Sequence, residues 1–224
     1  MRNQSGMSLI EMLSTLFITA FIGAIMTEIA VTQNVVSLKA STKMDSLVAA
    51  RRFFSSFEHD VHMARSFVSI TPTSLQLETP VYATSGAQVG LPQMSSSQWL
   101  INTVTYSLIA DTDPTRTGQY MLQKTVVSPS STTTTILVSG IVGPMDPANT
   151  TTPKIFRYYR QTSAGTTLID APTAGFTNPL DMTQIAGARM TVEIAPENSA
   201  RSDATTRSFA FASDVFSRTN VISP

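Results

Sequence analysis

The sequence predicts an α+β fold in which a long N-terminal helix is followed by an antiparallel β-sheet head. Three observations lead to this expectation: an apolar run from Met7 to Val31, a helix-period apolar stripe beyond it, and alternation of period two after Pro72. The first half of the helix is expected to span a membrane, and its second half to pack on the sheet. Lys plus Arg and Asp plus Glu both number 15, so bulk charge does not favour binding to nucleic acid.

The apolar run from Met7 to Val31 has Glu11 and Glu28 as its only charged residues. At about 1.5 Å per residue it reaches about 38 Å, which exceeds a hydrocarbon core of roughly 30 Å. An ordinary secretory signal has a basic leader and a cleavage site after a shorter apolar core. Here the small residue Gly6 precedes the run, so cleavage there would leave the anchor attached.

Beyond Val31 the pattern predicts that the helix continues to near Ser66, because apolar residues recur at alternating spacings of three and four. The stripe contains Leu47, Ala50, Phe54, Phe57, Val61, Ala64 and Val68. We expect Leu47, Phe54, Phe57 and Val61 to pack against the head. A coiled coil is the alternative, but the stripe is short and lacks sustained charged flanks.

The opposite helix face is predicted to be solvated. It carries Arg51, Arg52, Glu58, His59, Asp60, His62 and Arg65. The spacing of Glu58, His59 and His62 permits metal ligands on one face. Local charge pairing is the preferred interpretation, and no metal is assigned.

After Pro72, segments rich in β-branched and aromatic residues are separated by Pro, Gly, Asn and Ser or Thr loops. The predicted strands are Ser74–Glu78, Trp99–Ile109, Gln119–Val127, Thr135–Val142, Lys154–Arg160, Arg189–Ala195 and Arg207–Phe216. A helix followed by such strands predicts an antiparallel sheet.

The residues Gly6-Met7-Ser8-Leu9-Ile10-Glu11 and the apolar helix after them resemble the prepilin signal of type IV pilins and of type II secretion pseudopilins. The resemblance implies a pilin-like fold, and a prepilin peptidase that cuts between Gly6 and Met7 and methylates the new amine of Met7. Many relatives begin the mature chain with Phe and carry a mid-membrane Pro. This chain has Met7, and only Gly23 in that region.

Glu11 gains a physical explanation from this cleavage. The new α-amino group of Met7 and the carboxylate four residues later have opposite charges at nearly the same depth. In a stack of subunits, Glu11 of one helix would neutralise the amine of its neighbour only at the correct axial offset. We therefore expect Glu11 to set the assembly register.

The order of several segments is similar to that in larger minor subunits, the J-type minor pseudopilins and W-type minor pilins. These are ARRFFSSFEHDVHMAR, TVTYSLI, GQYMLQK, KIFRYY and SFAFASDVFSRTN. The resemblance implies a structural subunit at or near a filament tip that helps to prime assembly. Its partners would be prepilin peptidase, other major and minor pilins, inner-membrane lipid and the assembly platform.

The expected organisation is a leader at residues 1–6, a transmembrane and filament-core segment at 7–31, an amphipathic helix at 32–66 and a β-rich head at 67–224. The chain is expected to be a single-pass protein of the bacterial inner membrane, with its head outside the cytoplasm, before it enters a filament. The lone Arg2 gives the positive-inside rule little support, because more basic residues follow the span than precede it. Pilus, secretion and competence systems share this N-terminal logic, so the system stays open.

The sequence contains no recognised catalytic or cofactor motif, so we expect no enzyme activity and no cofactor. Asp111 and Asp113 could begin a calcium loop, but the later Gly and Glu of an EF-hand are missing, which favours a polar turn. The interleaved basic and aromatic residues from Lys154 to Arg160 permit contact with DNA. Alternation in a half-buried strand is the preferred explanation, with the aromatic residues inward and the arginines outward. Two other functions stay open: a tip-exposed module that binds a surface, an exported substrate or DNA, and a bitopic membrane protein unrelated to pili.

Overall fold

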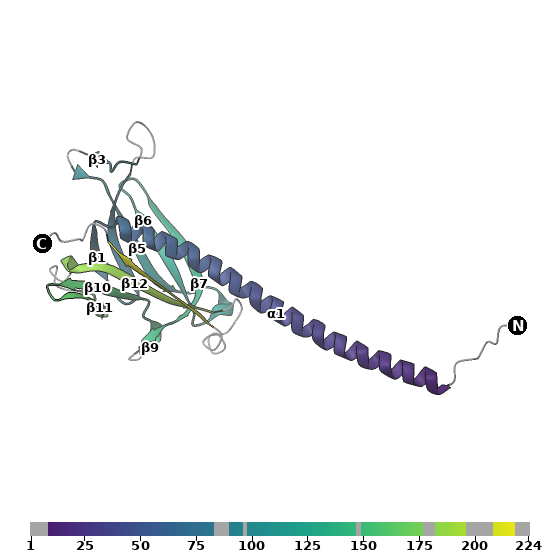
Figure 1. Cartoon of the computed structure of the whole chain (residues 1–224). Coiled ribbons are helices and arrows are strands. Elements are labelled where there is room, and N and C mark those ends of the chain that lie inside the picture. Colours follow the sequence, from purple (N-terminus) through teal and green to yellow (C-terminus); the bar gives the residue numbers. More distant parts are fainter. Residues whose placement is uncertain are drawn as a thin grey trace. The chain divides into compact units, whose positions relative to one another are not determined.

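The computed structural model describes residues 9–82, 90–95, 98–146, 149–176, 182–195 and 208–217. Figure 1 labels the elements. Their bounds are α1 Leu9–Met63, β1 Ser66–Ile70, β2 Ser74–Pro80, β3 Met94–Ser95, β4 Gln98–Trp99, β5 Ile101–Ala110, η1 Pro114–Arg116, β6 Tyr120–Val127, β7 Thr132–Gly143, β8 Met145–Asp146, β9 Asn149–Pro153, β10 Phe156–Thr162, β11 Gly165–Asp170, β12 Ile185–Ile194 and β13 Phe209–Phe216.

The main sheet has nine strands in the order β1-β2-β5-β6-β7-β12-β10-β11, with β13 paired to β12. Every pairing within it is antiparallel. β13 pairs with β12 along the whole stretch from Gly187 to Ile194, so it occupies one edge of β12. β10 and β7 therefore lie along the other edge of β12, where β10 pairs with its first part and β7 with its last two residues. The predicted α+β fold with an antiparallel sheet is confirmed.

The long helix α1 ends at Met63, slightly before the predicted end near Ser66. The Arg65 N–H donates to the carbonyl oxygen of Glu78 at 2.7 Å, which draws the chain into β1. Val68, which continues the apolar spacing of the helix, lies in β1 instead and is 45% exposed. The spacing by itself does not distinguish a last helical turn from the beginning of an edge strand.

The chain divides into two compact units, residues 1–44 and 45–224. In the first unit the described helix leaves its large apolar side chains exposed. In the second, the end of α1 and the sheet share one hydrophobic core. The strands contribute to it by strict alternation: in β2, Leu75, Leu77 and Thr79 are buried while the residues between them are partly exposed.

All seven predicted strand segments contain an observed strand, with differences at the ends. β1 and β11 were not predicted, and neither were the short strands β3, β8 and β9. β1 begins where the predicted helix ends, and its Val68 continues the apolar spacing of that helix, which obscures the strand. β11 pairs with β10 from Asp170 to Gly165 and contains few large apolar residues, so it lacks the alternation that marks a half-buried strand.

Candidate functional site

The cleavage and methylation positions, Gly6 and Met7, lie outside the described residues, which begin at Leu9. Glu11 lies in the first turn of α1. A carboxylate there is favoured by the partial positive charge of the helix N-terminus. The Thr15 hydroxyl donates to the Glu11 carbonyl oxygen at 2.6 Å, and the Ser14 hydroxyl to that of Ile10 at 2.9 Å.

The segment from Leu9 to Ser37 is long and apolar enough to cross a membrane by length and composition, with a mean hydropathy of 2.0. Its hydroxyl side chains bond to the preceding helical turn, as Thr19 does to Thr15 and Thr27 to Gly23. Such local bonds satisfy polar groups where no water is present. The lateral surface that remains is apolar and exposed, so it requires lipid or other helices around it.

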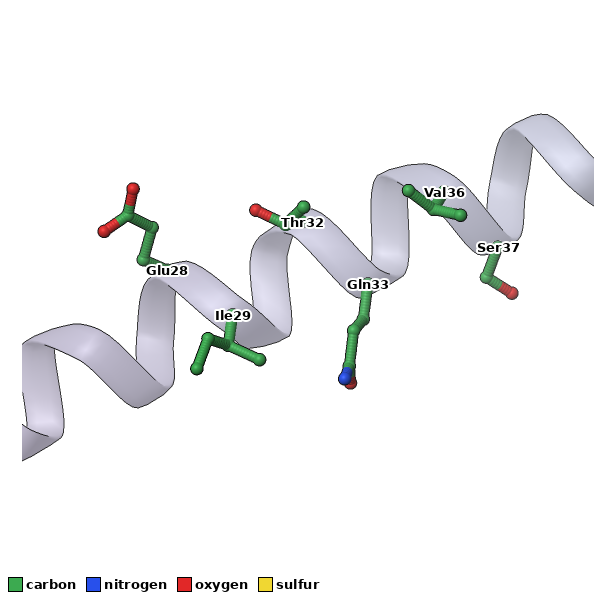
Figure 2. A pocket seen from close by; sticks show the side chains of 6 residues that line it. All are labelled: Glu28, Ile29, Thr32, Gln33, Val36 and Ser37. Carbon is green, nitrogen blue, oxygen red and sulfur yellow. The ribbon is translucent and has the colours of Figure 1, made fainter.

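Glu28 is the second carboxylate of this segment, about 26 Å along the helix axis from Glu11 at 1.5 Å per residue. Figure 2 shows Glu28, Thr32 and Val36 following one another along one side of α1, at intervals of four residues, with Ile29 and Gln33 on another side. Glu11 and Glu28 are the only charged residues between Leu9 and Ser37. The apolar segment continues for nine residues beyond Glu28.

The second half of α1 presents aromatic residues to the sheet. Phe57 and Val61 are fully buried, and Phe54 is 9% exposed. The Phe57 ring meets Tyr106 of β5 edge-on, with 5.5 Å between the centroids, and lies 6.3 Å from Phe156 of β10. Leu47 differs from this group because it is 41% exposed. The helix enters the core at Ala50, one turn later than the predicted stripe begins.

Asp60 corrects the prediction of a solvated opposite face, because it is only 8% exposed. The Tyr106 hydroxyl donates to Asp60 Oδ2 at 2.6 Å, and Lys124 Nζ lies 2.5 Å from the same oxygen. Lys124 Nζ also donates to Ser56 Oγ at 3.0 Å. Burial, and then the nearby charge of Asp60, raise the pKa of the Tyr106 phenol, so the hydroxyl remains a donor.

These polar contacts among α1, β5 and β6 were missed by the sequence analysis. A signal was available: Asp60 is three residues after Phe57 and four before Ala64, which places it on the buried stripe. Apolar contacts are not directional, so on their own they would tolerate small shifts or rotations of the helix. A buried carboxylate that must meet two donors keeps its contacts in only one position of the helix. The contacts therefore fix the axial and rotational register of α1 on the sheet.

β13 holds the adjacent side of the helix. The Ser213 hydroxyl donates to Glu58 Oε1 at 2.6 Å, and the Ser217 hydroxyl to the Ala64 carbonyl oxygen at 2.9 Å. His62 Nδ1 lies 2.8 Å from the carbonyl oxygen of Phe216. A carbonyl only accepts, so Nδ1 carries the hydrogen. Glu58 and His62 therefore bond to β13, and the described residues contain no group of three potential metal ligands.

Residues 1–27 match the family described as the prokaryotic N-terminal methylation motif. The chain carries a prepilin-type signal. The motif supports the type IV pilin and pseudopilin superfamily, and indicates a structural protein that is a prepilin peptidase substrate and assembles with other pilins. With the apolar helix, it fits a single-pass inner-membrane anchor and then a filament. No curated protein and no solved structure matches the chain significantly.

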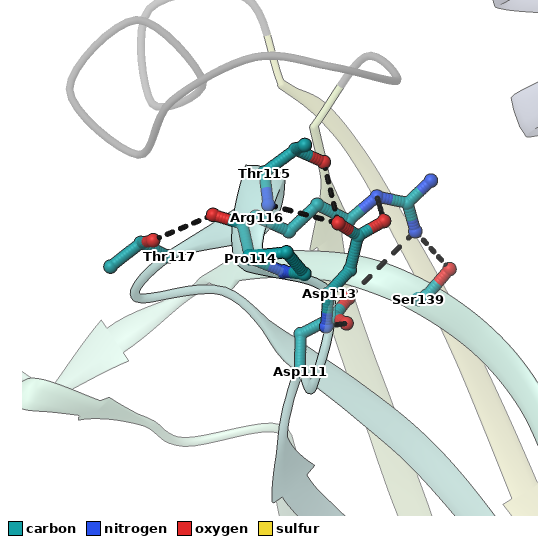
Figure 3. A network of polar contacts seen from close by, with 7 residues as sticks. All are labelled: Asp111, Asp113, Pro114, Thr115, Arg116, Thr117 and Ser139. Atoms are coloured by element: carbon teal, nitrogen blue, oxygen red, sulfur yellow. Dashed lines mark hydrogen bonds and ion pairs between the residues drawn. The ribbon is translucent and has the colours of Figure 1, made fainter.

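The acidic loop between β5 and β6 is a polar turn organised by its own side chains (Figure 3). Asp113 caps η1, accepting from the backbone N–H of Thr115 at 2.9 Å and from its hydroxyl at 2.7 Å. These bonds lower the pKa of the Asp113 carboxyl. Arg116 lies 3.7 Å from Asp111 Oδ2 and donates to Ser139. A guanidinium thus occupies the place between the two carboxylates that a cation would take.

The basic and aromatic strand β10 follows the alternation of a half-buried sheet. Phe156 and Tyr158 are buried, while Arg157 faces outward and pairs with Asp170 at 2.5 Å. Tyr159 donates to Asp214 Oδ1 at 2.8 Å, and Arg189 pairs with the same carboxylate. The hydrogen bond from Arg189 lowers the pKa of Asp214. Carboxylates thus offset much of the positive charge that DNA contact would require.

Proposed function

We propose that the protein is a minor pilin or pseudopilin that is incorporated at or near the tip of a type IV pilus-like filament or secretion pseudopilus, where it helps to prime assembly. Residues 1–6 are the leader, 7–31 the membrane and filament-core segment, 32–66 the amphipathic helix, and 67–224 a head outside the cytoplasm. Glu11 sets the axial register against the methylated amine of a neighbouring subunit.

The observation that carries this proposal is that one helix has an exposed apolar part and a part packed on the sheet. The first part of α1 exposes a mainly apolar surface in which Glu11 and Glu28 are the only charged residues, and the last part is bonded to a nine-stranded sheet through Asp60. A helix that is anchored only at one end can leave lipid for a bundle of similar helices without disturbing the head. The same property suits a subunit that is extracted from the membrane into a filament.

The placement at the tip rests on the resemblance of several segments, in their order along the chain, to those of the larger minor subunits. Four of these segments form the packed half of α1 and the strands β5, β6 and β10, and a fifth contains β13. These elements build the interface between the helix and the sheet. The segments that carry the resemblance therefore belong to the scaffold that joins the helix to the sheet.

Two measurements test the proposal together. Mass spectrometry of the mature chain, co-expressed with a prepilin peptidase, is expected to show N-methyl-Met7 and loss of residues 1–6. Gold labelling of an epitope-tagged head is expected to mark filament ends, at one or a few particles per filament. Labelling along the whole filament would make the protein a major subunit, and an intact Met1 would favour the unrelated bitopic protein.

A second function, recognition by a tip-exposed head, is favoured by an open groove beside Tyr82 and Trp99. The ligand would be a surface, an exported protein or DNA. Deletion of the gene separates the two functions. Loss of filaments indicates priming, whereas normal filaments with lost adhesion, secretion or DNA uptake indicate recognition.

A further inference from the structure

The head contains an open groove of about 370 Å³ where the end of α1, the end of β2 and the start of β5 meet. Its apolar walls include Tyr82, Trp99, Pro80 and Pro92, and His62 and Arg65 add polar groups. This composition, mostly apolar and aromatic with a few polar groups, is typical of binding sites. Trp99 is 45% exposed although it is the only tryptophan in the chain.

The walls of the groove are held by backbone hydrogen bonds. Val81 donates to Leu100 at 2.9 Å, and Leu100 donates to Gln93 at the same distance. Gln93 in turn donates to Val81 at 2.7 Å. Trp99 itself pairs with Met94 in the small β3–β4 ladder. The aromatic surface is therefore preformed, which reduces the entropy lost when a partner binds.

The charged side chain among the residues that line the groove is Arg65. Arg65 is exposed, and within the described part of the chain no carboxylate forms an ion pair with its guanidinium. His62 is held in place by its bond to the Phe216 carbonyl oxygen. An occupant that combines an apolar group with a carboxylate would satisfy both the aromatic wall and Arg65.

A terminal strand of the main sheet begins at the same place. β1 is the terminal strand of the main sheet and starts at Ser66, directly after Arg65. No described strand pairs with its outer edge. An extended polypeptide can add to such an edge through main-chain hydrogen bonds while its side chains enter neighbouring pockets. A small molecule would use the groove and leave this edge unused.

We propose that the groove docks an extended segment of another protein, in which an apolar side chain packs against Trp99 and Tyr82 and an adjacent carboxylate pairs with Arg65. Trp, Tyr and Arg are the residues most enriched among those that dominate binding energy at protein interfaces. The inference names a site for recognition by the head. It does not depend on cleavage or tip placement, so mass spectrometry and gold labelling can fail or succeed independently of it.

The single tryptophan allows a direct test with the full-length mature chain in detergent micelles. The probes are blocked hexapeptides, acetyl-TPXEVT-amide with Leu, Ile or Phe at X, and the same peptides with Lys in place of Glu. We expect a saturable change in Trp99 emission, with affinity about twofold to fivefold higher for the Glu peptides, in the range of an exposed charge pair. Arg65→Gln should remove this preference.

Arg52→Gln is the matched control, because it removes the same charge from an exposed position on α1 outside the groove. It should keep the preference for Glu. The proposal is overturned if no peptide changes Trp99 emission at millimolar concentration, or if Glu and Lys peptides bind equally. A change in emission caused only by a neutral oligosaccharide such as maltohexaose would also overturn it, because the occupant would then be a glycan. If deletion of residues 218–224 alone changes the emission, the occupant is this chain's own C-terminal segment, and the proposal is wrong.

Discussion

The two halves of α1 have similar apolar side chains and opposite burial. Phe17 and Phe21 are 73% and 61% exposed, whereas Phe53 and Phe57 are 1% and 0% exposed. The same helical backbone carries all four residues. The difference arises because the second half meets a sheet of its own chain, while the first half leaves its apolar surface to lipid or to other helices.

The polar side chains of the two halves of α1 form hydrogen bonds with different partners. In the first half, Thr15, Thr19 and Thr27 bond back to their own helix, so none of these three bonds points to a neighbour. In the second half, Asp60 and Glu58 bond to strands. One surface is therefore free to exchange partners, and the other holds a single register. A subunit that moves from membrane to filament needs both properties.

The largest expected effect comes from Phe57→Ala. The fully buried ring fills the space between α1, β5 and β10, so its loss should lower the free energy of unfolding of the head by about 4 kcal/mol. Phe17→Ala in the exposed half is the matched control and should change it by less than about 0.5 kcal/mol. Urea unfolding of the full chain in micelles, followed by Trp99 emission, measures both. Equal effects of the two substitutions would contradict the claim that only the second half of α1 stabilises the head.

Asp60→Ala is expected to cost about 3 kcal/mol, because it leaves Lys124 partly buried without its counter-charge. Glu58→Ala on the exposed side of the same helix should cost no more than about 1 kcal/mol. The double variant Asp60→Leu with Lys124→Met removes both charges and should be more stable than Asp60→Ala alone. If the double variant is no more stable than Asp60→Ala, the contribution of Asp60 to stability does not come from its ion pair with Lys124.

The spacing of apolar residues predicted the strands in which apolar and polar residues alternate. The prediction failed where the same spacing fits both a helix and a strand. The alternation in β5, β6, β10 and β12 has only one interpretation, a half-buried strand. Val68 continues the spacing of a helix but lies in β1, and the ion pair of Asp60 depends on Lys124, more than 60 residues away. Gly6, Met7 and Glu11 form a local motif, so they were recognisable without any knowledge of the head. The groove was not, because it joins residues from separate segments.

The pH dependence of the head should come from buried phenols of the second unit. Burial raises the pKa of Tyr158, whose hydroxyl donates to the Thr71 carbonyl oxygen at 2.6 Å. Above pH 10 the unfolded chain loses this proton while the folded chain keeps it, so stability present at pH 7 declines as pH rises, by about 1.4 kcal/mol per pH unit for each such tyrosine. Tyr158→Phe should cost about 1 kcal/mol at pH 7 and flatten the decline measured by urea unfolding between pH 10 and 11.

Glu11→Ala should have the smallest effect on the head and a complete effect on assembly. The carboxylate lies in the exposed unit, so the unfolding free energy of the head should stay within about 0.5 kcal/mol of the parent protein. Removal of the leader and membrane insertion should also persist. Incorporation into filaments should be lost, because the amine of a neighbouring subunit has no carboxylate at the correct offset. Glu28→Ala is the matched control in the same half of α1. If it abolishes incorporation while Glu11→Ala does not, the register is set at Glu28 rather than beside the new N-terminus.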